Sequence, residues 1–589
     1  MPARAWDMGR RRQPRAGARR GVVILVGVYY TGLASFTFYT RVRSRVMRAS
    51  RRALLSLADL RMGAQFLWRL PAFLRHPVNL EEARATLRHR LAWRDADFLA
   101  IVKRAIYEHS GSPYRALLTF AGCEYGDLEK LVIQDGVEGA LRTLLRQGVY
   151  LTVDEFKGRS PVVRGSATIA ADPTRLRNPD SASHLQVQSS GSRGPGAVVG
   201  VDLAFVRDTN VNYGMALDAR GGAAWHHAIW GVPGTAAMRQ LLRFGDFGAP
   251  PVRWFSQIDP VAGGLHPRYR WSARLIRWGG LFAGIPLPGS VHAPIDDPLP
   301  IARWMAGVLR AGGTPHVLTF PSSAVRLCQA ARAAGMDLQG GQLTIGGEPI
   351  TAARLAEIRR TGMVAVPRYG SAEAVFIAYG CLAPEAPDDL HVFHDLHALI
   401  HAGLEVQVPG LPDTALFITS LRPTAPLVLL NVSLGDKAEM IRRACGCPLE
   451  RLGWTTHLHT IRSYEKLTAG GMTFLDTDLV RVLEEVLPAR FGGGPTDYQL
   501  VEEETEDGHP RLRLLVHPTV GALDTQAVAE TFLTAISPGS GVERVMGLLW
   551  RDAGFLRVER RSPESTPGGK ILHLRAASRP AAASPEAGR

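Results

Sequence analysis

Lysine and cysteine are both scarce in this chain of 589 residues. Lysine accounts for six of the 69 Lys and Arg residues, and the five cysteines are an odd number. A sparse, odd set of thiols argues against the disulfide framework of a secreted protein. No Gly-Lys-Ser/Thr follows a glycine run, and no Gly-x-Ser-x-Gly occurs. These absences exclude a Walker-type phosphate loop and the nucleophile elbow of a serine hydrolase.

Positive charge is concentrated at one end of the chain. The formal net charge is +15, but residues 1–52 contain 13 Arg and one acid, Asp7, and therefore carry +12. The other 537 residues carry only +3. This nearly neutral body shows no stripe of interleaved basic and aromatic residues, so nucleic-acid binding is not predicted. With 46% hydrophobic residues, the length favours two or more domains around large cores.

Hydrophobic periodicity predicts an α/β protein. Residues 53–165 are expected to be mostly helical, because apolar residues recur every three or four positions in 98–107 and 128–145. Residues 166–462 alternate short apolar runs with helix-like segments, which is typical of α/β layering. The clearest of these are a strand at 315–320, a helix at 322–334 and a strand at 342–345.

A smaller α/β domain is predicted over residues 463–575. Its pattern is a helix at 474–489, strands at 498–502 and 511–516, and a helix at 524–536. Its length is within the usual range of a domain. Residues 576–589, which are rich in Ala and Pro, are expected to be disordered.

Two glycine-containing segments are candidates for nucleotide binding. A loop rich in serine and glycine can surround an anion with backbone N–H groups and hydroxyls, and an arginine adds positive charge. Its residues are Ser189, Ser190, Gly191, Ser192, Arg193 and Gly194, and a plain surface turn is the alternative. Gly346 and Gly347 follow a predicted strand, a common position for nucleotide binding in α/β sheets.

A third segment, Tyr369-Gly370-Ser371-Ala372-Glu373, combines three residues that suit nucleotide binding. Tyr369 offers an aromatic face for a base, and Gly370 permits close approach. Glu373 supplies the hard oxygen ligand that Mg²⁺ prefers. Further along, Asp436 offers the acceptor-only oxygens that suit a sugar diol.

Lys570 follows Gly568 and Gly569 near the end of the chain. Since almost all other cationic residues of the chain are arginines, a lysine here indicates a position that needs a compact ammonium group on a flexible stem. An exposed turn lysine is the alternative.

In chain order, these segments resemble the adenylate-forming (acyl-activating) superfamily, and most closely its phenylacetate–CoA ligase-like branch. The resemblance implies an α/β fold with a large multi-layered adenylation domain and a small mobile C-terminal lobe. It implies an AMP-forming ligase that uses ATP and Mg²⁺ to activate a carboxylic acid, and then transfers the acyl group to CoA. It covers roughly residues 100–575 and rests on residues 189–194, Gly346-Gly347-Glu348, 369–373, Gly435-Asp436, Arg462 and Lys570.

The resemblance also assigns roles to these positions. Tyr369 would pack on adenine, Glu373 would bind Mg²⁺ and Asp436 would accept hydrogen bonds from ribose. Lys570 would neutralise charge that develops in the transition state. The remaining residues would contact the nucleotide: Ser189, Ser190, Gly191, Ser192, Arg193, Gly194, Gly346, Gly347, Glu348, Gly370, Ser371 and Arg462.

Two segments depart from the family pattern. Arg193 and Pro195 stand where the family has more Thr and a Lys, and Asn431 begins a segment that lacks the usual Arg before Gly435. The contacts around the phosphates and the ribose are therefore expected to differ from those of the family.

The resemblance further implies a structural zinc site of three thiolates and one imidazole, a set typical of closed tetrahedral sites. Its ligands would be Cys381, His391, Cys445 and Cys447, with His394 or His397 as alternatives to His391. Small buried thiols with surface histidines are the other interpretation.

The acyl pocket is the least defined feature. Trp225-His226-His227, Trp230 and Trp254-Phe255 would suit an aryl or medium-chain carboxylate, although ordinary core packing is the favoured interpretation. Transfer to a protein thiol or an amine, as in acyl-protein synthetases, remains open. So does an inactive scaffold that retains the fold. The oligomeric state is not predicted.

Residues 21–40 are uncharged and lie between arginine-rich flanks. Their length allows a membrane span, but Tyr, Thr, Ser and Gly lower the hydropathy of the second half. A membrane anchor, a targeting segment and a later translation start at Met47 or Met62 are the three interpretations. The last is favoured, because ATP-dependent activation is expected in the cytoplasm.

Overall fold

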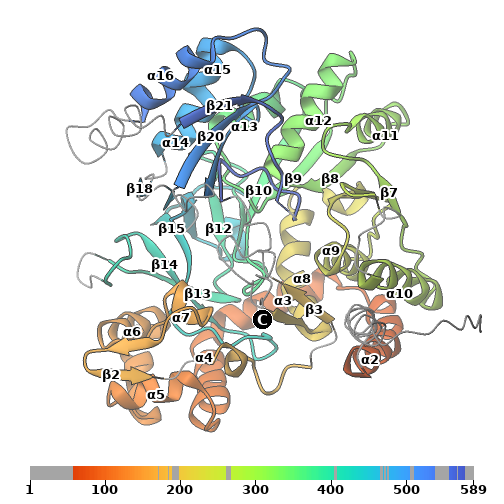
Figure 1. Cartoon of the computed structure of the whole chain (residues 1–589). Helices are drawn as coiled ribbons and strands as arrows, with labels where there is room; N and C mark the ends of the chain where they lie inside the picture. Colours follow the sequence, from red (N-terminus) through yellow and green to blue (C-terminus); the bar gives the residue numbers. More distant parts are fainter. Residues whose placement is uncertain are drawn as a thin grey trace, which may run out of the picture. The chain divides into compact units, whose positions relative to one another are not determined.

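The computed structural model (Figure 1) describes residues 57–169, 172–182, 185–188, 198–259, 267–403, 408–464, 468–469, 472–473, 477–504, 510–536, 556–566 and 568–576. Every described residue belongs to one compact unit, which begins at Leu55. The predictions for residues 1–52, for the loop at 189–194 and for the tail after Ala576 lie outside the described residues. Among the helices that are described, none has the length and apolar character needed to cross a membrane.

The described chain begins with helices. Asn79 Oδ1 accepts a hydrogen bond from the Glu81 N–H at 2.8 Å and caps α3, while Thr152 caps α7. One face of α6 is buried through Leu128, Val132 and Leu141. The helices expected at 98–107 and 128–145 are confirmed. The elements are α2 (Leu57–Arg75), α3 (Leu80–Ala92), α4 (Arg94–Val102), the π-helix η1 (Lys103–Tyr107), α5 (Pro113–Phe120), α6 (Tyr125–Arg146) and α7 (Val153–Phe156).

A mixed sheet forms the centre of the molecule, with 12 strands among the described residues in the order β13-β14-β15-β16-β12-β11-β10-β9-β8-β5-β6-β7. Neighbouring strands from β7 to β10 are parallel. The predicted strand–helix–strand pattern at 315–345 is confirmed by β8, α12 and β9. This half contains β5 (His226–Gly231), β6 (Arg253–Ser256), β7 (Ser290–His292), β8 (Pro315–Thr319), β9 (Gln342–Gly346) and β10 (Val364–Tyr369).

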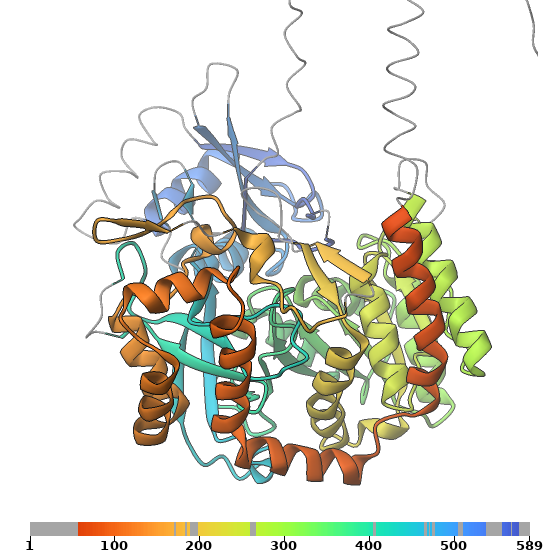
Figure 2. The same cartoon turned by 90° about the horizontal axis from the view of Figure 1, so that it is seen from below.

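The other half of the sheet is antiparallel from β10 to β13. Its strands are β11 (Ala378–Gly380), β12 (Leu390–Val392), β13 (His397–His401), β14 (Ala415–Ser420), β15 (Val432–Arg442) and β16 (Thr456–Ser463), followed along the chain by the pair β17 (Thr468–Ala469) and β18 (Met472–Thr473). Helices α4–α6 pack on this half, in orange in Figure 2, and share one apolar core with β11–β16.

Helices cover both faces of the parallel half. One apolar cluster joins α2, α3, α8 (Leu203–Asp218), α9 (Thr235–Asp246) and α10 (Pro267–Ala283) to one face. A second cluster joins α11 (Leu299–Arg310), α12 (Pro321–Ala333) and α13 (Ala352–Arg359) to the other. The remaining small elements of residues 57–464 are β1 (Val162–Arg164), β2 (Ala167–Ile169), η2 (Pro173–Leu176), β3 (Leu185–Gln188), β4 (Val198–Val201), η3 (Gly222–Ala224) and η4 (Glu450–Leu452).

The C-terminal residues form a separate sheet in the order β21-β20-β19-β22, with an apolar core of its own. The predicted helices and strands are confirmed where the chain is described, by α14 (Thr477–Arg481), the π-helix η5 (Val482–Val486), α15 (Leu487–Phe491), β19 (Tyr498–Glu504), β20 (Pro510–Val516) and α16 (Thr525–Ala535). Two further strands, β21 (Leu556–Arg560) and β22 (Leu574–Ala576), were not predicted.

Candidate functional site

A tight loop follows β10 and carries Glu373. The Ser371 Oγ accepts hydrogen bonds from the backbone N–H groups of Glu373 (3.2 Å) and Ala374 (2.9 Å). The chain then turns back through Val375, whose φ of 67° is an outlier for a β-branched residue. A Cβ atom at Gly370 would lie 2.0 Å from the Val375 carbonyl oxygen, so only glycine fits there. The loop therefore stores backbone strain beside Glu373, a pattern that is common at functional sites.

The predicted adenine and ribose residues are in direct contact. The Tyr369 hydroxyl at the end of β10 donates a hydrogen bond to Asp436 Oδ2 in β15 at 2.8 Å, across 67 residues of sequence. Burial, and then the negative charge of Asp436, raise the pKa of Tyr369 well above its ordinary value. The hydroxyl therefore stays protonated and remains a donor at neutral pH.

Arg462 and Asn431 are held by groups that the sequence analysis did not single out. Arg462 forms an ion pair with Asp388 Oδ2 at 3.1 Å, and the same carboxylate accepts the N–H groups of Thr460 and Ile461. Asn431 is fully buried and its amide donates to the carbonyl oxygens of Leu141 and Val149. Asn431 thus joins β15 to the helical region, which gives this departure from the family pattern a structural role.

The turn that carries Lys570 lies against the ends of the parallel strands. The Thr566 N–H donates to the Lys570 carbonyl at 2.8 Å and closes the turn. Lys570 Nζ lies 3.3 Å from the position that a Cβ atom would occupy at Gly347, and 5.8 Å from the centre of the Phe320 ring. Gly569 has a φ of 81°, and a Cβ atom there would lie 2.0 Å from Gln257 Oε1. The turn therefore needs glycine for both its backbone conformation and its close approach.

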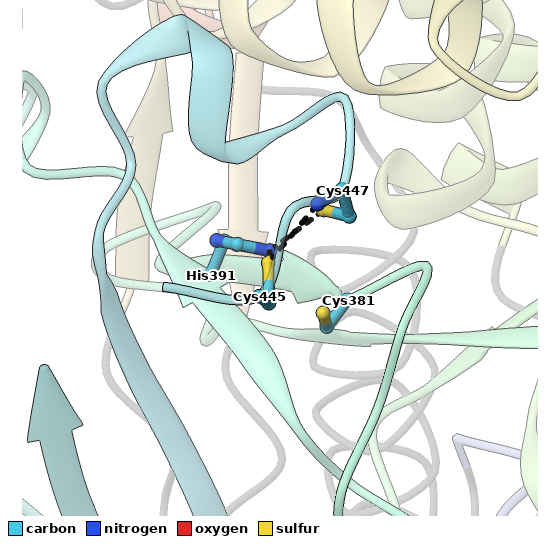
Figure 3. Close-up of side chains that lie close together, drawn as sticks. All are labelled: Cys381, His391, Cys445 and Cys447. Carbon is cyan, nitrogen blue, oxygen red and sulfur yellow. Dashed lines mark hydrogen bonds between the residues drawn. The ribbon is translucent and has the colours of Figure 1, made fainter. Parts of the chain in front are cut away.

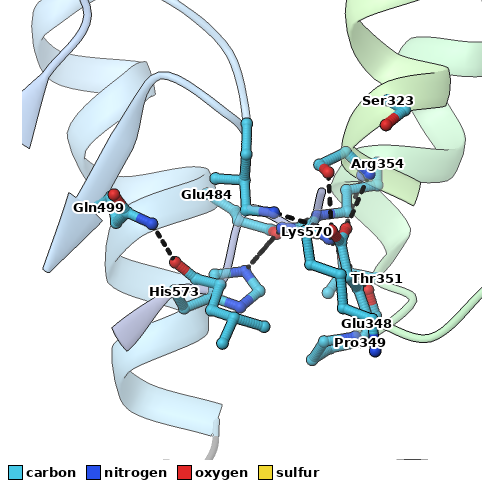
Figure 4. A network of polar contacts seen from close by, with 12 residues as sticks. Ser323, Glu348, Pro349, Thr351, Arg354, Glu484, Gln499, Lys570 and His573 are labelled. Carbon is cyan, nitrogen blue, oxygen red and sulfur yellow. Dashed lines mark hydrogen bonds and ion pairs between the residues drawn. The ribbon is translucent and has the colours of Figure 1, made fainter. Parts of the chain in front are cut away.

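A buried polar network joins the C-terminal residues to the main sheet (Figure 4). Arg354 donates to Glu348 Oε2 at 3.0 Å and to Glu484 Oε1 at 2.7 Å, and its side chain is 1% exposed. Glu348 also accepts the N–H and hydroxyl of Ser322 and the Ile571 N–H. The Ile571 contact ties the residue after Lys570 directly to the strand-end glycine segment.

Glu484 is the second anion of this network. It is bonded to Arg354, to Thr351 and, at 2.6 Å, to His573 Nε2. Burial raises the pKa of Glu484, but the charge of Arg354 and the contact with His573 outweigh burial and hold it at about 2. Glu484 therefore stays ionised, and the structure places Glu348 in the same buried ionic network.

Several of these residues escaped the sequence analysis. Arg354, Glu484 and Gln257 lie far from the motifs in sequence and belong to no short pattern, so no local signal identifies them. Asp388 and Asp389, by contrast, are two adjacent acids before a buried strand. A buried acid needs a hydrogen-bond or charge partner, so these two acids could have been recognised from the sequence as members of a polar contact.

The Cys/His set converges at one place (Figure 3). The ligand atoms of Cys381, His391, Cys445 and Cys447 all lie within 4.8 Å of one another, and three of the four residues are buried. His391 Nε2 lies 3.2 Å from Cys447 Sγ and 3.6 Å from Cys445 Sγ.

The surroundings of this cluster orient its imidazole. His391 Nδ1 lies 2.6 Å from the Trp454 carbonyl oxygen. Because a carbonyl oxygen can only accept a hydrogen bond, Nδ1 is the nitrogen that carries the hydrogen. The lone pair of Nε2 is therefore directed at the thiols, an arrangement typical of metal-binding histidines. Burial raises the pKa of Cys447, but several backbone N–H groups outweigh it and lower the value below normal. The two alternative histidines lie elsewhere: His394 contacts the Thr456 N–H, and His397 contacts the Ala374 carbonyl.

The aromatic segments proposed for the acyl pocket lie on and beside β5 and β6, and most of their side chains are buried. His226 pairs with Pro315 at the amino-terminal end of β5, the edge of the parallel sheet opposite Tyr369. Trp230 and Trp254 are buried, and Trp230 donates to the Ala293 carbonyl. His227 is buried against His316, with 2.9 Å between the two Nδ1 atoms. The favoured interpretation, ordinary core packing with an exposed histidine, agrees with this placement.

Comparison with known proteins identifies the fold. No protein-family model matches the chain, and no curated protein matches it. The protein is similar in structure to a 2-hydroxyisobutyryl-CoA ligase in the postadenylation state, in complex with R3-HIB-AMP. The comparison gives a TM-score of 0.50 and 15% sequence identity, and it covers 85% of this chain and 91% of that chain. The chain thus has the fold of the adenylate-forming ligases, which confirms the predicted fold class.

Two further structures give lower scores. The same ligase in complex with 2-HIB-AMP has a TM-score of 0.48, with 15% identity over 85% of this chain and 91% of that chain. An anthranilate CoA ligase in complex with anthranoyl-AMP has a TM-score of 0.39, with 12% identity over 78% of this chain and 79% of that chain.

Proposed function

We propose that the protein is an AMP-forming ligase that activates a carboxylic acid with ATP and transfers the acyl group to CoA. One observation carries the proposal. Lys570, from the C-terminal sheet region, reaches Gly347, while the neighbouring strand β10 ends at Tyr369 in contact with Asp436. A cation therefore lies beside the end of β9, and the neighbouring parallel strand β10 ends in an aromatic side chain that contacts an acceptor carboxylate. The ends of parallel strands are where α/β folds commonly bind ligands.

Each of these residues would have a separate role in adenylation. Tyr369 would pack on the base and Asp436 would accept hydrogen bonds from the ribose hydroxyls. Glu373 would bind the Mg²⁺ that accompanies ATP. Lys570 would neutralise negative charge as the carboxylate oxygen attacks the α-phosphorus and pyrophosphate leaves. The loop at 189–194 would bind phosphate, and Arg462 would approach the nucleotide from the boundary of the C-terminal lobe.

Residues 463–575 would form the mobile lobe of this enzyme, with 53–165 and 166–462 as the helical and sheet parts of the adenylation domain. Thioester formation would require the lobe to change its orientation after adenylation. CoA is the proposed acceptor, and the cytoplasmic location stays a prediction.

The experiment that tests the function is carboxylate-dependent exchange of pyrophosphate into ATP across a panel of acids. We expect exchange that requires one class of acid, followed by thioester formation when CoA is added. Exchange without thioester formation would indicate that the acyl acceptor is a carrier-protein thiol or an amine instead of CoA. Measurable ATP binding with no exchange for any acid would contradict the ligase proposal and favour an inactive homologue.

We further propose that Cys381, His391, Cys445 and Cys447 hold a structural zinc ion. The donor set fits, since three thiolates and one imidazole make a closed tetrahedral shell with no position left for substrate. The carbonyl of Trp454 fixes the required histidine tautomer.

Metal analysis tests this site. We expect about one zinc per purified chain, and a loss of most of that zinc in Cys447→Ser together with a lower melting temperature. Cys123→Ser is the matched control, because Cys123 is also buried but lies outside the cluster. Equal zinc content in the two variants, or no zinc in the wild type purified without chelator, would contradict the assignment.

A further inference from the structure

Three arginines converge beside the loop that carries Glu373. Arg239 and Arg243 lie one turn apart on α9, and Arg368 is the residue before Tyr369 at the end of β10. The Phe376 ring is shared by two of them: the Cζ atom lies 3.7 Å from the ring centre for Arg243 and 5.5 Å for Arg368. Phe376 therefore brings together arginines from a helix and from a strand.

Arg243 is a fixed member of this cluster. It is 1% exposed and donates to Asn210 Oδ1 at 3.2 Å and to Gln240 Oε1 at 2.8 Å. On its other side Phe376 stacks on Tyr213, with 5.1 Å between ring centres and 6° between planes. This arrangement makes a rigid floor of aromatic rings with one buried positive charge.

The cluster has three positive charges and little counter-charge, which comes from Glu373 acting on Arg239. Within the described part of the chain none of the three guanidinium groups forms an ion pair with a carboxylate, and Arg239 Nε, Arg243 Nη2 and Arg368 Nε are buried without a hydrogen-bond partner. Burial, reinforced by mutual repulsion in the case of Arg239 and Arg243, lowers the pKa of each arginine; that of Arg239 falls to about 10. Buried guanidinium nitrogens without a partner are costly, so a bound anion would stabilise this cluster.

The cluster lies across β10 from the contact between Tyr369 and Asp436. Successive residues of a strand point to opposite faces, and the side chain of Tyr369 packs with the core of the antiparallel half. Arg368 instead points toward α9, on the same face as Val366. Arg239 and Arg368 are partly exposed rather than buried, so a ligand can reach both. A group bound there is therefore separate from the base and the ribose, yet close to Glu373, whose charge acts on Arg239.

We propose that Arg239 and Arg368 bind a second anionic group on the carboxylic acid substrate, and that Arg243 and the Phe376–Tyr213 stack form the floor of this subsite. The inference rests on the proposed ligase function and specifies its substrate class. The substrate is a dicarboxylic acid, or a carboxylic acid that bears a sulfonate or phosphate. The planar, permanently charged guanidinium suits bidentate binding of such groups. The triphosphate of ATP has the same chemistry, and the test separates the two sources.

The test compares dicarboxylic acids with their monomethyl esters in ATP–pyrophosphate exchange. The wild type is expected to use a diacid with a kcat/KM at least about 10-fold above that of its monoester. Arg239→Gln and Arg368→Gln are each expected to raise the KM for the diacid by about 10- to 100-fold, the range for a hydrogen bond to a charged group. The KM values for the monoester and for MgATP should stay unchanged. Arg310→Gln, at an exposed position at the end of α11, is the control.

A second measurement does not depend on catalysis. Diacid without nucleotide is expected to raise the melting temperature of the wild type, and Arg239→Gln should abolish that shift, while Arg239→Lys, which keeps the charge, should retain part of it. Equal use of diacid and monoester by the wild type, or equal effects of Arg239→Gln on both acids, would overturn the subsite. A higher KM for MgATP with every acid would assign the arginines to the triphosphate and overturn it as well. Absence of exchange with both acid classes, while the diacid still shifts the melting temperature, would instead contradict the ligase function.

Discussion

Lys570→Ala is expected to slow ATP–pyrophosphate exchange by about 100- to 1,000-fold, the usual effect of removing one preorganised charge that stabilises a transition state. The ammonium group lies beside Gly347 at the end of β9, where a developing negative charge would be neutralised. Nucleotide affinity is expected to change little, because Tyr369 and Asp436 belong to the other part of the site. The measurements are the exchange rate at saturating substrate and the dissociation constant of ATP.

Two companion variants make this result specific. Lys130→Ala is the matched control, since Lys130 is one of the few other lysines and its side chain is 74% exposed. It should leave the exchange rate unchanged. Lys570→Arg keeps the charge but replaces a compact ammonium with a planar fork, so only partial activity is expected. Full activity in Lys570→Ala would remove Lys570 from the catalytic step.

Arg354→Met is expected to destabilise the protein by about 3–5 kcal/mol, the cost of leaving buried ions without their partner. Arg354 is the cation between Glu348 and Glu484, and both carboxylate side chains are at most 1% exposed. The variant should therefore unfold at a lower denaturant concentration. Its C-terminal sheet, which includes the strand after Lys570, should become more accessible to protease.

The matched control for this prediction is Arg360→Met. Arg360 also forms an ion pair with a glutamate, Glu357, but its side chain is 63% exposed, and exposed pairs contribute about 0–1 kcal/mol. If both variants lose the same stability, the buried network does not join the C-terminal residues to the sheet as described. A selective loss in Arg354→Met would also slow exchange, because Ile571, beside Lys570, shares Glu348 with Arg354.

The network has a consequence for the proposed lobe movement. A change in the orientation of residues 463–575 would separate Glu484 and His573 from Arg354, and would expose charges that are now buried. Such a step would be favourable only if water or new contacts satisfied these groups. Arg354 therefore links the stability of this arrangement to the chemistry that Lys570 is proposed to perform.

Local features of the protein could be predicted from the sequence alone. The alternation of apolar residues located α4, α6, α12, β8 and β9 because helix and strand periodicities depend on neighbouring residues. Gly370 was identified as a position of close approach, but the structure shows that the approaching group is the Val375 carbonyl of the same loop. The order of these segments was enough to indicate the fold.

The tertiary structure decided which distant residues meet. It selected His391 over His394 and His397 for the Cys/His cluster, and it placed His226 at the sheet edge opposite Tyr369. It also assembled the network of Arg354, Glu348 and Glu484, and the cluster of Arg239, Arg243 and Arg368. None of these arrangements has a short-range signature, because burial and the pairing of charges depend on strand order and on packing between segments far apart in the chain.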